Sequence, residues 1–468
     1  MSPATRVAPT NSAARLGGLR QELAALLDEA GSQASWSVAV QSLSSNERLF
    51  VRDAQRLLVP GSTIKLMTAV TAAEAVGWDY TFTTQADITG PVTDGVLQGD
   101  LLLRGSGDPA LHGRGGTELV PALAAALRAR GIGRIAGRVI GDDSLVEDAR
   151  PGLAWSWDDL GTRTGTLAGA LNIDENVMRI TVAPGATTGV AARVSGPAEA
   201  SDLPITASAI TTGAGTPSSV WPEARPGQVG LVIAGAIASD SPPLVVTAAV
   251  GNPTRWFAGV VRTRLIATGI AVDGAAVDGD DIGPLPASVT PLLTHRSHTL
   301  AEVIRPMLKD SINMYAEAVL KLATGPAGVR DTGAALSAER GYLDGWGLDT
   351  RAIRLADGSG LSRWNVVSAD TLVGLLVRQQ AMAPFVDALP IAGRDGTLAG
   401  RMVGTPAAGN ARAKSGSMTH VRSLAGYVTT ADGERLAFAV IANNTGLTGP
   451  MLDGVIDRLV ARLAAFRR

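Results

Sequence analysis

The sequence has no cysteine among its 468 residues. This absence excludes disulfide bonds, thiolate zinc sites and cysteine nucleophiles together. It is consistent with export to an oxidising compartment without establishing it. Long apolar runs are also missing, since none reaches the roughly 18–20 residues that a membrane-spanning helix requires. We therefore expect at most a peripheral contact with a membrane.

A strong net charge is absent too. The formal net charge is −2 at pH 7, so the overall electrostatics do not favour nucleic acid as a partner. With 46% hydrophobic and 18% charged residues, the composition indicates a folded globular chain. Residues 1–18 lack the apolar core of a signal peptide. Either the protein is cytoplasmic, or its signal peptide is absent from this sequence.

Lysine is scarce. Only four of the 41 basic residues are lysines, namely Lys65, Lys309, Lys321 and Lys414. Arginine stays protonated in proteins, whereas a desolvated lysine can act as a base near neutral pH. A lysine that persists in an arginine-rich sequence is therefore a candidate for a role that arginine cannot fill, with survival by drift as the alternative.

The two ends of the chain carry the same kind of pattern. Helices are predicted over 15–29, 60–77, 300–323 and 451–466, and strands over 35–43, 47–54, 409–418, 422–430 and 435–444. From about residue 86 to 289, short alternating segments punctuated by Gly, Pro and Asp predict a β-rich region with few helices beyond 119–131. The sequence thus predicts an α+β fold: a discontinuous domain of residues 15–85 and 290–468, interrupted by a β-rich insertion of one or two subdomains at 86–289.

The first candidate site is Ser62-Thr63-Ile64-Lys65, at the start of a predicted helix. Residues three apart lie on one helical face, so the Lys65 amine could take the proton of Ser62 as its Oγ attacks a carbonyl. The backbone N–H groups of the helix N-terminus would lie close to the developing oxyanion. The alternative is a capping serine followed by a surface lysine.

Two further motifs follow in the chain. Ser311-Ile312-Asn313 offers a hydroxyl that could relay a proton and an amide that could hold a peptide bond, although Ser-x-Asn also starts many helices. Lys414-Ser415-Gly416 lies on a predicted strand, where the lysine could bind a carboxylate and the glycine would admit a substrate backbone. A solvated lysine that protects a sheet edge is the alternative there.

The three motifs together, S-x-x-K, S-x-N and K-[ST]-G in that order, are the signature of penicillin-binding proteins and serine β-lactamases. Two of the four lysines occupy the two motif positions that require one. The large insertion after the first motif resembles that of the low-molecular-mass class C penicillin-binding proteins, the D-Ala-D-Ala carboxypeptidase/endopeptidase family (peptidase S13). Segments similar to that family's recur over nearly the whole chain, at 99–111, 171–176, 357–363, 393–402 and 404–416.

The resemblance implies a reaction. Ser62 would attack the carbonyl between two D-alanines of a peptidoglycan stem peptide, or that of a D-Ala cross-link, and form an acyl-enzyme that water hydrolyses. Lys65 would be the general base, Ser311 a proton relay, and Asn313 would hold the acyl-side amide. Lys414 would supply positive potential and help to bind the substrate's terminal carboxylate. β-Lactam antibiotics would act as covalent inhibitors, because they mimic the substrate.

The resemblance also implies substrate-binding residues. Ser415, Gly416 and Ser417 would line the site, and the backbone N–H groups of Ser62 and Ser417 would form the oxyanion hole. The third motif reads Lys-Ser-Gly-Ser where Lys-Thr-Gly-Thr is commoner, which keeps the hydroxyl groups but could shift side-chain preference. Asp159 and Arg363 match positions that contact a diaminopimelate-like end of the substrate. The alternative for these two is a surface carboxylate and a structural ion pair.

The fold that the resemblance implies is a penicillin-binding/β-lactamase-like transpeptidase domain, an antiparallel sheet between helices. The expected location is extracytoplasmic, in the periplasm or cell envelope, with no cofactor and no metal. A serine β-lactamase and a catalytically silent cell-wall-binding protein stay as alternatives. A zinc site at His295 and His298 is poorly supported, because a lone pair of loop histidines is usually only polar.

Overall fold

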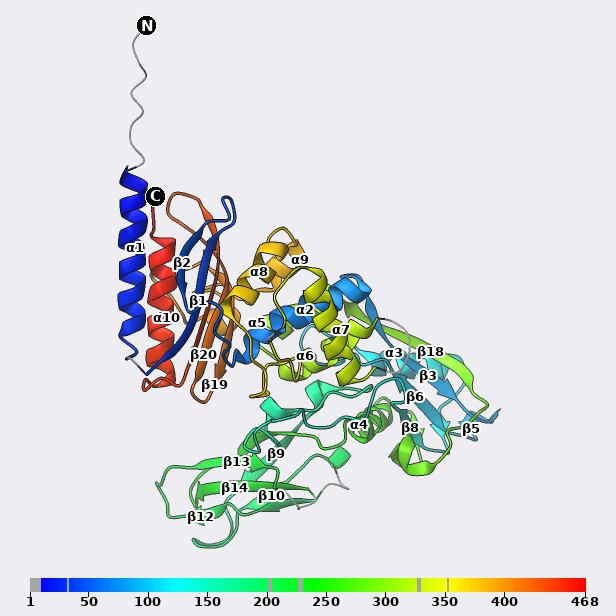
Figure 1. Ribbon diagram of the computed structural model, residues 1–468. Helices are drawn as coiled ribbons and strands as arrows, with labels where there is room; N and C mark the ends of the chain where they lie inside the picture. Colours follow the sequence, from blue (N-terminus) through cyan, green and yellow to red (C-terminus); the bar gives the residue numbers. More distant parts are fainter. Residues whose placement is uncertain (1–9, 32, 201–203, 226–229, 326–329, 352) are drawn as a thin grey trace. The chain divides into compact units, whose positions relative to one another are not determined.

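The computed structural model of the chain (Figure 1) describes residues 10–31, 33–200, 204–225, 230–325, 330–351 and 353–468. It contains two compact units, each discontinuous in sequence. The first comprises the described residues of Met1–Glu74, Ile304–Ser311 and Leu336–Arg468, and the second those of Ala75–Val303 and Ile312–Ala335. These limits differ from those of the predicted domains, whose boundaries stay a prediction.

The first unit is built on one five-stranded antiparallel sheet. Its strands are β1 (Ser35–Ser42), β2 (Arg48–Arg52), β19 (Arg412–Met418), β20 (Val421–Thr429) and β21 (Arg435–Asn443), in the order β19-β20-β21-β1-β2. The N-terminal strand β1 lies beside β21 from the other end of the chain, with Val38 opposite Val440. The predicted sheet made from both ends of the chain is therefore confirmed.

Helices cover both faces of this sheet. Figure 1 shows α1 (Thr10–Asp28) and α10 (Gly449–Ala464) side by side on one face and α8 (Ala369–Gln379) on the other. Apolar side chains of α1 and α10, among them Leu23 and Leu459, are fully buried in the core that they share with the sheet. Each such leucine contributes about 2 kcal/mol by leaving water. The apolar stripe of α10 therefore packs on the sheet.

The second unit is rich in short strands, as predicted. Its largest sheet has the order β17-β8-β6-β3-β18, and the others have the orders β16-β7-β5-β4, β10-β9-β15 and β11-β14-β12 with β13 beside β14. The strands are β3 (Thr81–Ile88), β4 (Val92–Thr93), β5 (Val96–Leu97), β6 (Leu101–Gly105), β7 (Arg134–Ile135), β8 (Val139–Asp142), β9 (Val177–Ala183), β10 (Arg193–Ser195), β11 (Ile205–Ala207), β12 (Ile210–Thr212), β13 (Ser219–Glu223), β14 (Leu231–Ala238), β15 (Leu244–Ala249), β16 (Ala271–Val272), β17 (Ala276–Asp278) and β18 (Thr290–Thr299).

One long helix in this unit is not among the predicted elements. The predicted helix at 119–131 is α3 (Leu119–Ala129), but the structure adds α4 (Pro253–Ala267). Its start has a clear signal, because the Asn252 side chain accepts a hydrogen bond from the Arg255 backbone N–H and Pro253 occupies the first turn. Glycine and arginine residues inside the segment interrupt the apolar spacing of a helix. For that reason its sequence pattern resembled that of the neighbouring strands.

The predicted helix at 300–323 is broken in two. It forms α5 (Leu300–Lys309) and α6 (Asn313–Leu320), with Ser311 between them in the left-handed conformation at φ +60°. The predicted helix at 60–77 starts as a 3₁₀ turn, η1 (Gly61–Ile64), and continues as α2 (Lys65–Val76). Among the described residues, the remaining α-helices are α7 (Thr332–Gly345) and α9 (Ala383–Ala388), and neither these two nor α8 are among the predicted elements. Within the described residues, no helix combines the length and apolarity needed to cross a membrane.

Candidate active site

Ser62 and Lys65 are in direct contact in the first unit. The Lys65 Nζ donates a hydrogen bond of 2.8 Å to the Ser62 Oγ. The Lys65 side chain is fully buried, whereas Ser62 is half-buried. A capping serine with a surface lysine does not fit this geometry, because Ser62 lies inside η1 and the lysine is withdrawn from water.

The chain before Ser62 is fixed to the sheet by side chains of two strands. Asn443 on β21 bonds both the N–H and the C=O of Val59, at 2.8 and 3.0 Å. Ser423 on β20 donates to the Pro60 carbonyl at 2.5 Å. Gly61 then turns the chain at φ +56°, a conformation that suits glycine. The serine is therefore held on a rigid support.

A loop at 357–365 completes the surroundings of Lys65. The Ser359 carbonyl accepts a second hydrogen bond from the Lys65 Nζ at 2.7 Å. The buried Asp357 carboxylate shapes this loop by accepting from the Gly360 N–H at 2.8 Å, the Ser362 N–H at 2.5 Å and the Asn365 Nδ2 at 2.7 Å. The Lys65 amine thus has a fixed direction between a hydroxyl and a carbonyl.

The second and third motifs meet at Ser311 and Lys414. The Lys414 Nζ donates to the Ser311 Oγ at 2.8 Å and to the Ser415 carbonyl at 2.7 Å. Lys414 is fully buried on the edge strand β19. Burial first, and then the positive charge of Lys65, lower the pKa of Lys414 well below its ordinary value. The protonation of the Lys414 amine therefore depends on the charge of Lys65.

Two glycines let the segment of Ser62 and the strand β19 approach closely. A Cβ added to Gly416 would lie 2.4 Å from the Pro60 carbonyl oxygen and 3.0 Å from the Ser62 nitrogen. A Cβ added to Gly61 would lie 3.2 Å from the Ser417 nitrogen. The backbones around Ser62 and Ser417 are consequently neighbours, and only glycine permits that packing at Gly416.

The other predicted site residues form hydrogen bonds with groups outside the three motifs. Ser415 donates to the Thr397 Oγ1 at 2.7 Å, and the exposed Arg363 donates to the Thr419 carbonyl just beyond β19 at 3.3 Å. Asn313 and Asp159 belong to the second unit. Asn313 is the first residue of α6, and its Nδ2 donates to the Thr164 carbonyl at 2.9 Å. The half-buried Asp159 lies before the 3₁₀ turn at Arg163–Gly165, and its carbonyl accepts from the Thr162 Oγ1 at 2.7 Å.

The prediction of site residues missed the loop that carries Ser359 and Asp357. The segment 357–363 stood out only as a family-like stretch, since a backbone carbonyl leaves no residue-type signal. A signal did exist for its shape: Asp357 followed by two glycines is typical of a tight turn built around a carboxylate. Thr397 was likewise outside the predicted site.

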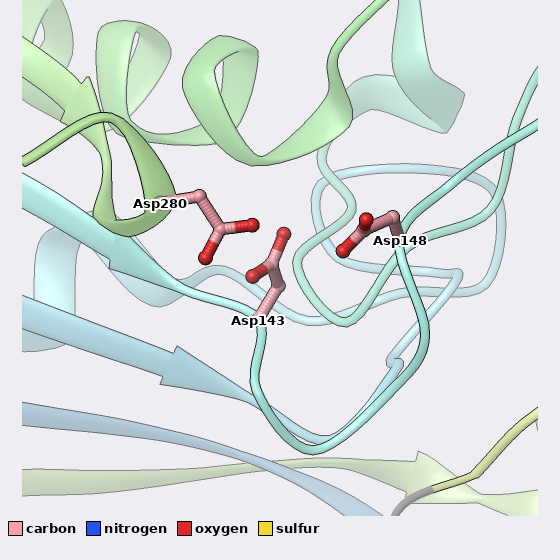
Figure 2. A group of neighbouring side chains, drawn as sticks. All are labelled: Asp143, Asp148 and Asp280. Atoms are coloured by element: carbon pink, nitrogen blue, oxygen red, sulfur yellow. The ribbon is translucent and has the colours of Figure 1, made fainter. Parts of the chain in front are cut away.

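One acidic cluster could be considered for a cation. Among the described residues, only Asp143, Asp148 and Asp280 form a group of three or more potential metal ligands (His, Cys, Asp or Glu) whose ligand atoms all lie within 4.8 Å of one another. Figure 2 shows their carboxyl groups converging. Burial is the main factor that raises the pKa of Asp143 to about 6. The cluster lies in the second unit, whereas Ser62 and Lys65 lie in the first.

The two histidines considered above for a zinc site each lie near another polar side chain. His295 Nε2 and the Thr117 Oγ1 are 2.7 Å apart, and His298 Nδ1 lies 3.8 Å from the Glu302 carboxylate.

The antiparallel sheet and the serine–lysine pair beside its edge strand define a penicillin-binding or β-lactamase-like fold. The structure of this chain matches a solved structure, penicillin binding protein 4 (dacB) from Haemophilus influenzae, with a TM-score of 0.82 at 24% identity. The match covers 95% of this chain and 99% of the solved chain. The model of the D-Ala-D-Ala carboxypeptidase 3 (S13) family matches residues 19–465. The chain belongs to this family.

Curated relatives agree with the family. The chain is 33% identical to a D-alanyl-D-alanine carboxypeptidase from Actinomadura sp. (strain R39), with 97% of this chain and 86% of the relative covered. It is 28% identical to the D-alanyl-D-alanine carboxypeptidase DacB from Haemophilus influenzae, with 86% and 84% covered. The resemblance stated from the three motifs is therefore confirmed over nearly the whole chain.

Proposed function

We propose that this protein is a serine DD-peptidase that cleaves the D-Ala-D-Ala bond, or the D-Ala-diamino acid cross-link, of peptidoglycan stem peptides. The observation that carries the proposal is the 2.8 Å contact between a half-buried serine hydroxyl and a fully buried lysine amine. A hydroxyl and an amine at this distance are positioned for proton transfer. Membership of the S13 family supports the substrate class.

In the acylation step, the Ser62 Oγ attacks the carbonyl carbon of the penultimate D-alanine. The unprotonated Lys65 amine takes the hydroxyl proton, and the Ser359 carbonyl keeps the amine directed at the serine. The backbone N–H groups of Ser62 and Ser417 stabilise the oxyanion. The close packing of Gly61 and Gly416 supports this role, because it brings the two segments together.

Collapse of the tetrahedral intermediate breaks the peptide bond and requires a proton on the leaving amine. Ser311 relays to it the proton that Lys65 took from Ser62, which leaves Lys65 unprotonated again, and the hydrogen bond of Ser311 with Lys414 supports this role. The released D-alanine or cross-linked peptide departs, leaving an ester on Ser62. A water molecule then attacks this ester, with Lys65 as the base, and restores the free serine. A β-lactam follows the same first step.

Lys414 binds the terminal carboxylate of the substrate. Burial lowers the pKa of its amine in the free protein, but an approaching carboxylate favours the protonated form and so raises that pKa again. Ser415, Gly416 and Ser417 offer the edge of β19 to the extended peptide. Asn313 holds the acyl-side amide, and Asp159 and Arg363 contact the polar end of the third residue.

The substrate implies an extracytoplasmic enzyme of the cell envelope. Carboxypeptidase and endopeptidase activity proceed through the same acyl-enzyme, and the shared site chemistry supports both. The DacB relative is named a carboxypeptidase, and a solved structure of penicillin binding protein 4 from Haemophilus influenzae holds a β-lactam.

The test is the intact mass of the protein after incubation with benzylpenicillin, beside the Ser62→Ala variant. We expect a persistent increase of one penicillin that maps to Ser62 and is absent from the variant. Release of D-alanine from a pentapeptide and cleavage of a cross-linked dimer then measure the two activities. Both should fall by roughly 10³-fold or more in Ser62→Ala, because the nucleophile is lost.

Two other outcomes would overturn the proposal. Rapid hydrolysis of penicillin without a persistent adduct would indicate a serine β-lactamase. Neither adduct nor hydrolysis, in a sample shown to be folded by circular dichroism, would indicate a catalytically silent cell-wall-binding protein.

A further inference from the structure

Lys309 is a third buried lysine in the first unit, and the proposed mechanism does not use it. It is the last residue of α5, two residues before Ser311. Its side chain is 11% exposed, and its Nζ donates to both carboxylate oxygens of Asp395, at 2.8 and 2.7 Å, and to the Leu389 carbonyl at 2.6 Å. Three acceptors fix the direction of this amine, so the end of α5 is tied to the segment 389–395.

That segment is in turn attached to the strand of Lys414. The Ala413 N–H donates to the Pro390 carbonyl at 2.9 Å, and the Ala392 N–H donates to the Ala411 carbonyl at 2.9 Å. Just after Asp395, the Thr397 hydroxyl accepts from Ser415 at 2.7 Å. The carboxylate that holds Lys309 therefore sits in a loop bonded to β19 on both sides of Lys414.

The backbone of this loop also packs closely against the main chain at the end of α5. A Cβ added to Gly396 would lie 2.4 Å from the Lys309 carbonyl oxygen. Gly396 has φ +56°, so glycine is favoured there for two reasons. The loop therefore touches the main chain at the end of α5 directly.

Ser311 needs such support. Its φ of +60° is unusual for a residue other than glycine and costs about 1 kcal/mol or more. Such a conformation persists only where the surrounding structure holds it. In this conformation its Oγ accepts the hydrogen bond of Lys414 at 2.8 Å.

We propose that the Lys309–Asp395 ion pair is a positioning device for the reaction, which holds Ser311 at hydrogen-bonding distance from Lys414 by joining the end of α5 to the loop on β19. The inference rests on the proposed function, since it assigns the pair a role in that proton relay. Neither residue touches the reacting atoms. A displacement of the relay hydroxyl by about 1 Å lowers the rate by about 100-fold.

The test is a double-mutant cycle with Ser311. Asp395→Asn removes the charge and keeps the shape of the side chain. We expect the limiting rate of acylation by benzylpenicillin to fall by roughly 10–100-fold, with a smaller change in the penicillin concentration that gives half of that rate. In the Ser311→Ala background, the same change should cost less than about 3-fold, because the group that the pair positions is gone.

Asp457→Asn is the matched control. It breaks another partly buried ion pair of the first unit, in which Asp457 on α10 lies 2.6 Å from Arg401. The melting temperature of Asp457→Asn should fall by about as much as that of Asp395→Asn. Its acylation rate should stay within about 3-fold of the wild type. If Asp395→Asn does not fold, Lys309→Met/Asp395→Leu replaces the pair by apolar side chains without burying a lone charge. It should show the same loss in the same cycle.

The outcomes separate this inference from the proposed function. Equal losses in both backgrounds would mean a merely structural pair, and an unchanged rate in Asp395→Asn would mean no role in acylation. Either result overturns the inference and leaves the proposed function intact. A wild-type protein that penicillin does not acylate overturns the proposed function itself, and with it the relay that the pair would serve.

Discussion

At the scale of single residues, the site depends on main-chain groups as much as on the side chains of the motifs. The Lys65 amine is directed by the Ser359 carbonyl, and the segment of Ser62 is held by a hydrogen bond to the Pro60 carbonyl. Glycine at position 416 is the residue that allows β19 to approach that segment. A change of one methyl group there is therefore a test of the packing alone.

Gly416→Ala places a Cβ 2.4 Å from the Pro60 oxygen and 2.3 Å from the Ser423 Oγ, so the backbone on one side must move. We expect acylation by benzylpenicillin to slow by about 100-fold, because the proposed oxyanion donors, the backbone N–H groups of Ser62 and Ser417, would separate. The stopped-flow or mass-spectrometric rate of acylation measures this change.

The control is Gly454→Ala in α10, where nothing lies within 4 Å of the added Cβ. It should raise the free energy of unfolding by about 0.5–1 kcal/mol, because alanine favours the helix. Its acylation rate should not change. An acylation rate of Gly416→Ala equal to that of the control would contradict the role of this close approach.

At the scale of elements, hydrophobic patterns predicted the five-stranded sheet and most helices. They did not predict the break in the helix at 300–323, where a contact with a residue distant in sequence is made. The segment 300–323 reads as one helix, but it turns at Ser311, where the hydroxyl bonds Lys414 on β19. The turn brings the Ser311 hydroxyl to a partner that is distant in sequence, which the local helical pattern does not reveal. For α4 the cap at Asn252 was a local signal that the surrounding strand-like texture concealed.

The loop after β8 faces the start of α4 and carries a pH-dependent group. Asp143 accepts a hydrogen bond from the Thr254 Oγ1 at 2.7 Å and lies beside Asp148 and Asp280 (Figure 2). Its pKa is raised to about 6, first by burial and then by the carboxylates of Asp278 and Asp280, whereas the Thr254 bond opposes the rise. The folded protein therefore binds this proton more tightly than the unfolded chain does.

Stability should thus fall as pH rises from about 4 to about 6 through this group. Asp143→Asn removes the penalty and keeps an acceptor for Thr254. We expect it to raise the free energy of unfolding by about 1 kcal/mol at pH 7.5, a value reduced for the partial exposure of the carboxyl group. At pH 4 the variant and the wild type should coincide. Denaturant unfolding at the two pH values measures the difference, and an equal gain at both would exclude the titration of Asp143 as its cause.

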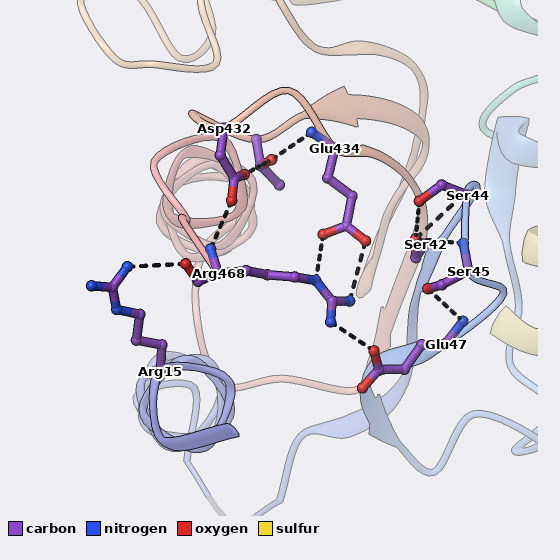
Figure 3. A network of polar contacts seen from close by, with 9 residues as sticks. Arg15, Ser42, Ser44, Ser45, Glu47, Asp432, Glu434 and Arg468 are labelled. Atoms are coloured by element: carbon purple, nitrogen blue, oxygen red, sulfur yellow. Dashed lines mark hydrogen bonds and ion pairs between the residues drawn. The ribbon is translucent and has the colours of Figure 1, made fainter. Parts of the chain in front are cut away.

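At the scale of the whole chain, residues from its two ends come together in the first unit. Figure 3 shows Arg468 between the hairpin turns that follow β1 and β20. Its guanidinium donates to Glu434 at 2.8 and 3.1 Å and to Glu47 at 2.8 Å, and Arg15 of α1 donates to its carbonyl at 2.9 Å. The bond to Glu434 is the main reason why the pKa of Arg468 is raised.

Arg468→Ala leaves Glu434, which is 12% exposed, without this partner. We expect the free energy of unfolding to fall by about 1–2 kcal/mol at low salt and by less in 1 M NaCl, because salt screens the remaining charges. The exposed neighbour Arg467 is the matched control, and Arg467→Ala should change stability by less than about 0.5 kcal/mol. Equal effects of the two variants would mean that the network does not stabilise the unit.

The sequence by itself determined the proximity of Ser62 and Lys65 and much of the architecture around them. Ser62 and Lys65 are three residues apart, so the geometry of one helical turn places their side chains on the same face. Alternating apolar residues likewise predicted the strands of the sheet, and apolar residues at helical spacing predicted α1 and α10 on one of its faces, whereas α8 on the other face was not predicted.

Only the tertiary structure decided how the three motifs combine. Lys414 meets a hydroxyl 103 positions away, and Lys65 meets a carbonyl 294 positions away. The Lys309–Asp395 pair spans 86 positions and joins segments with no shared motif. Such contacts depend on which strands pair and how closely their backbones pack. No short-range pattern of residue types encodes that information, because it arises only when the whole sheet has formed.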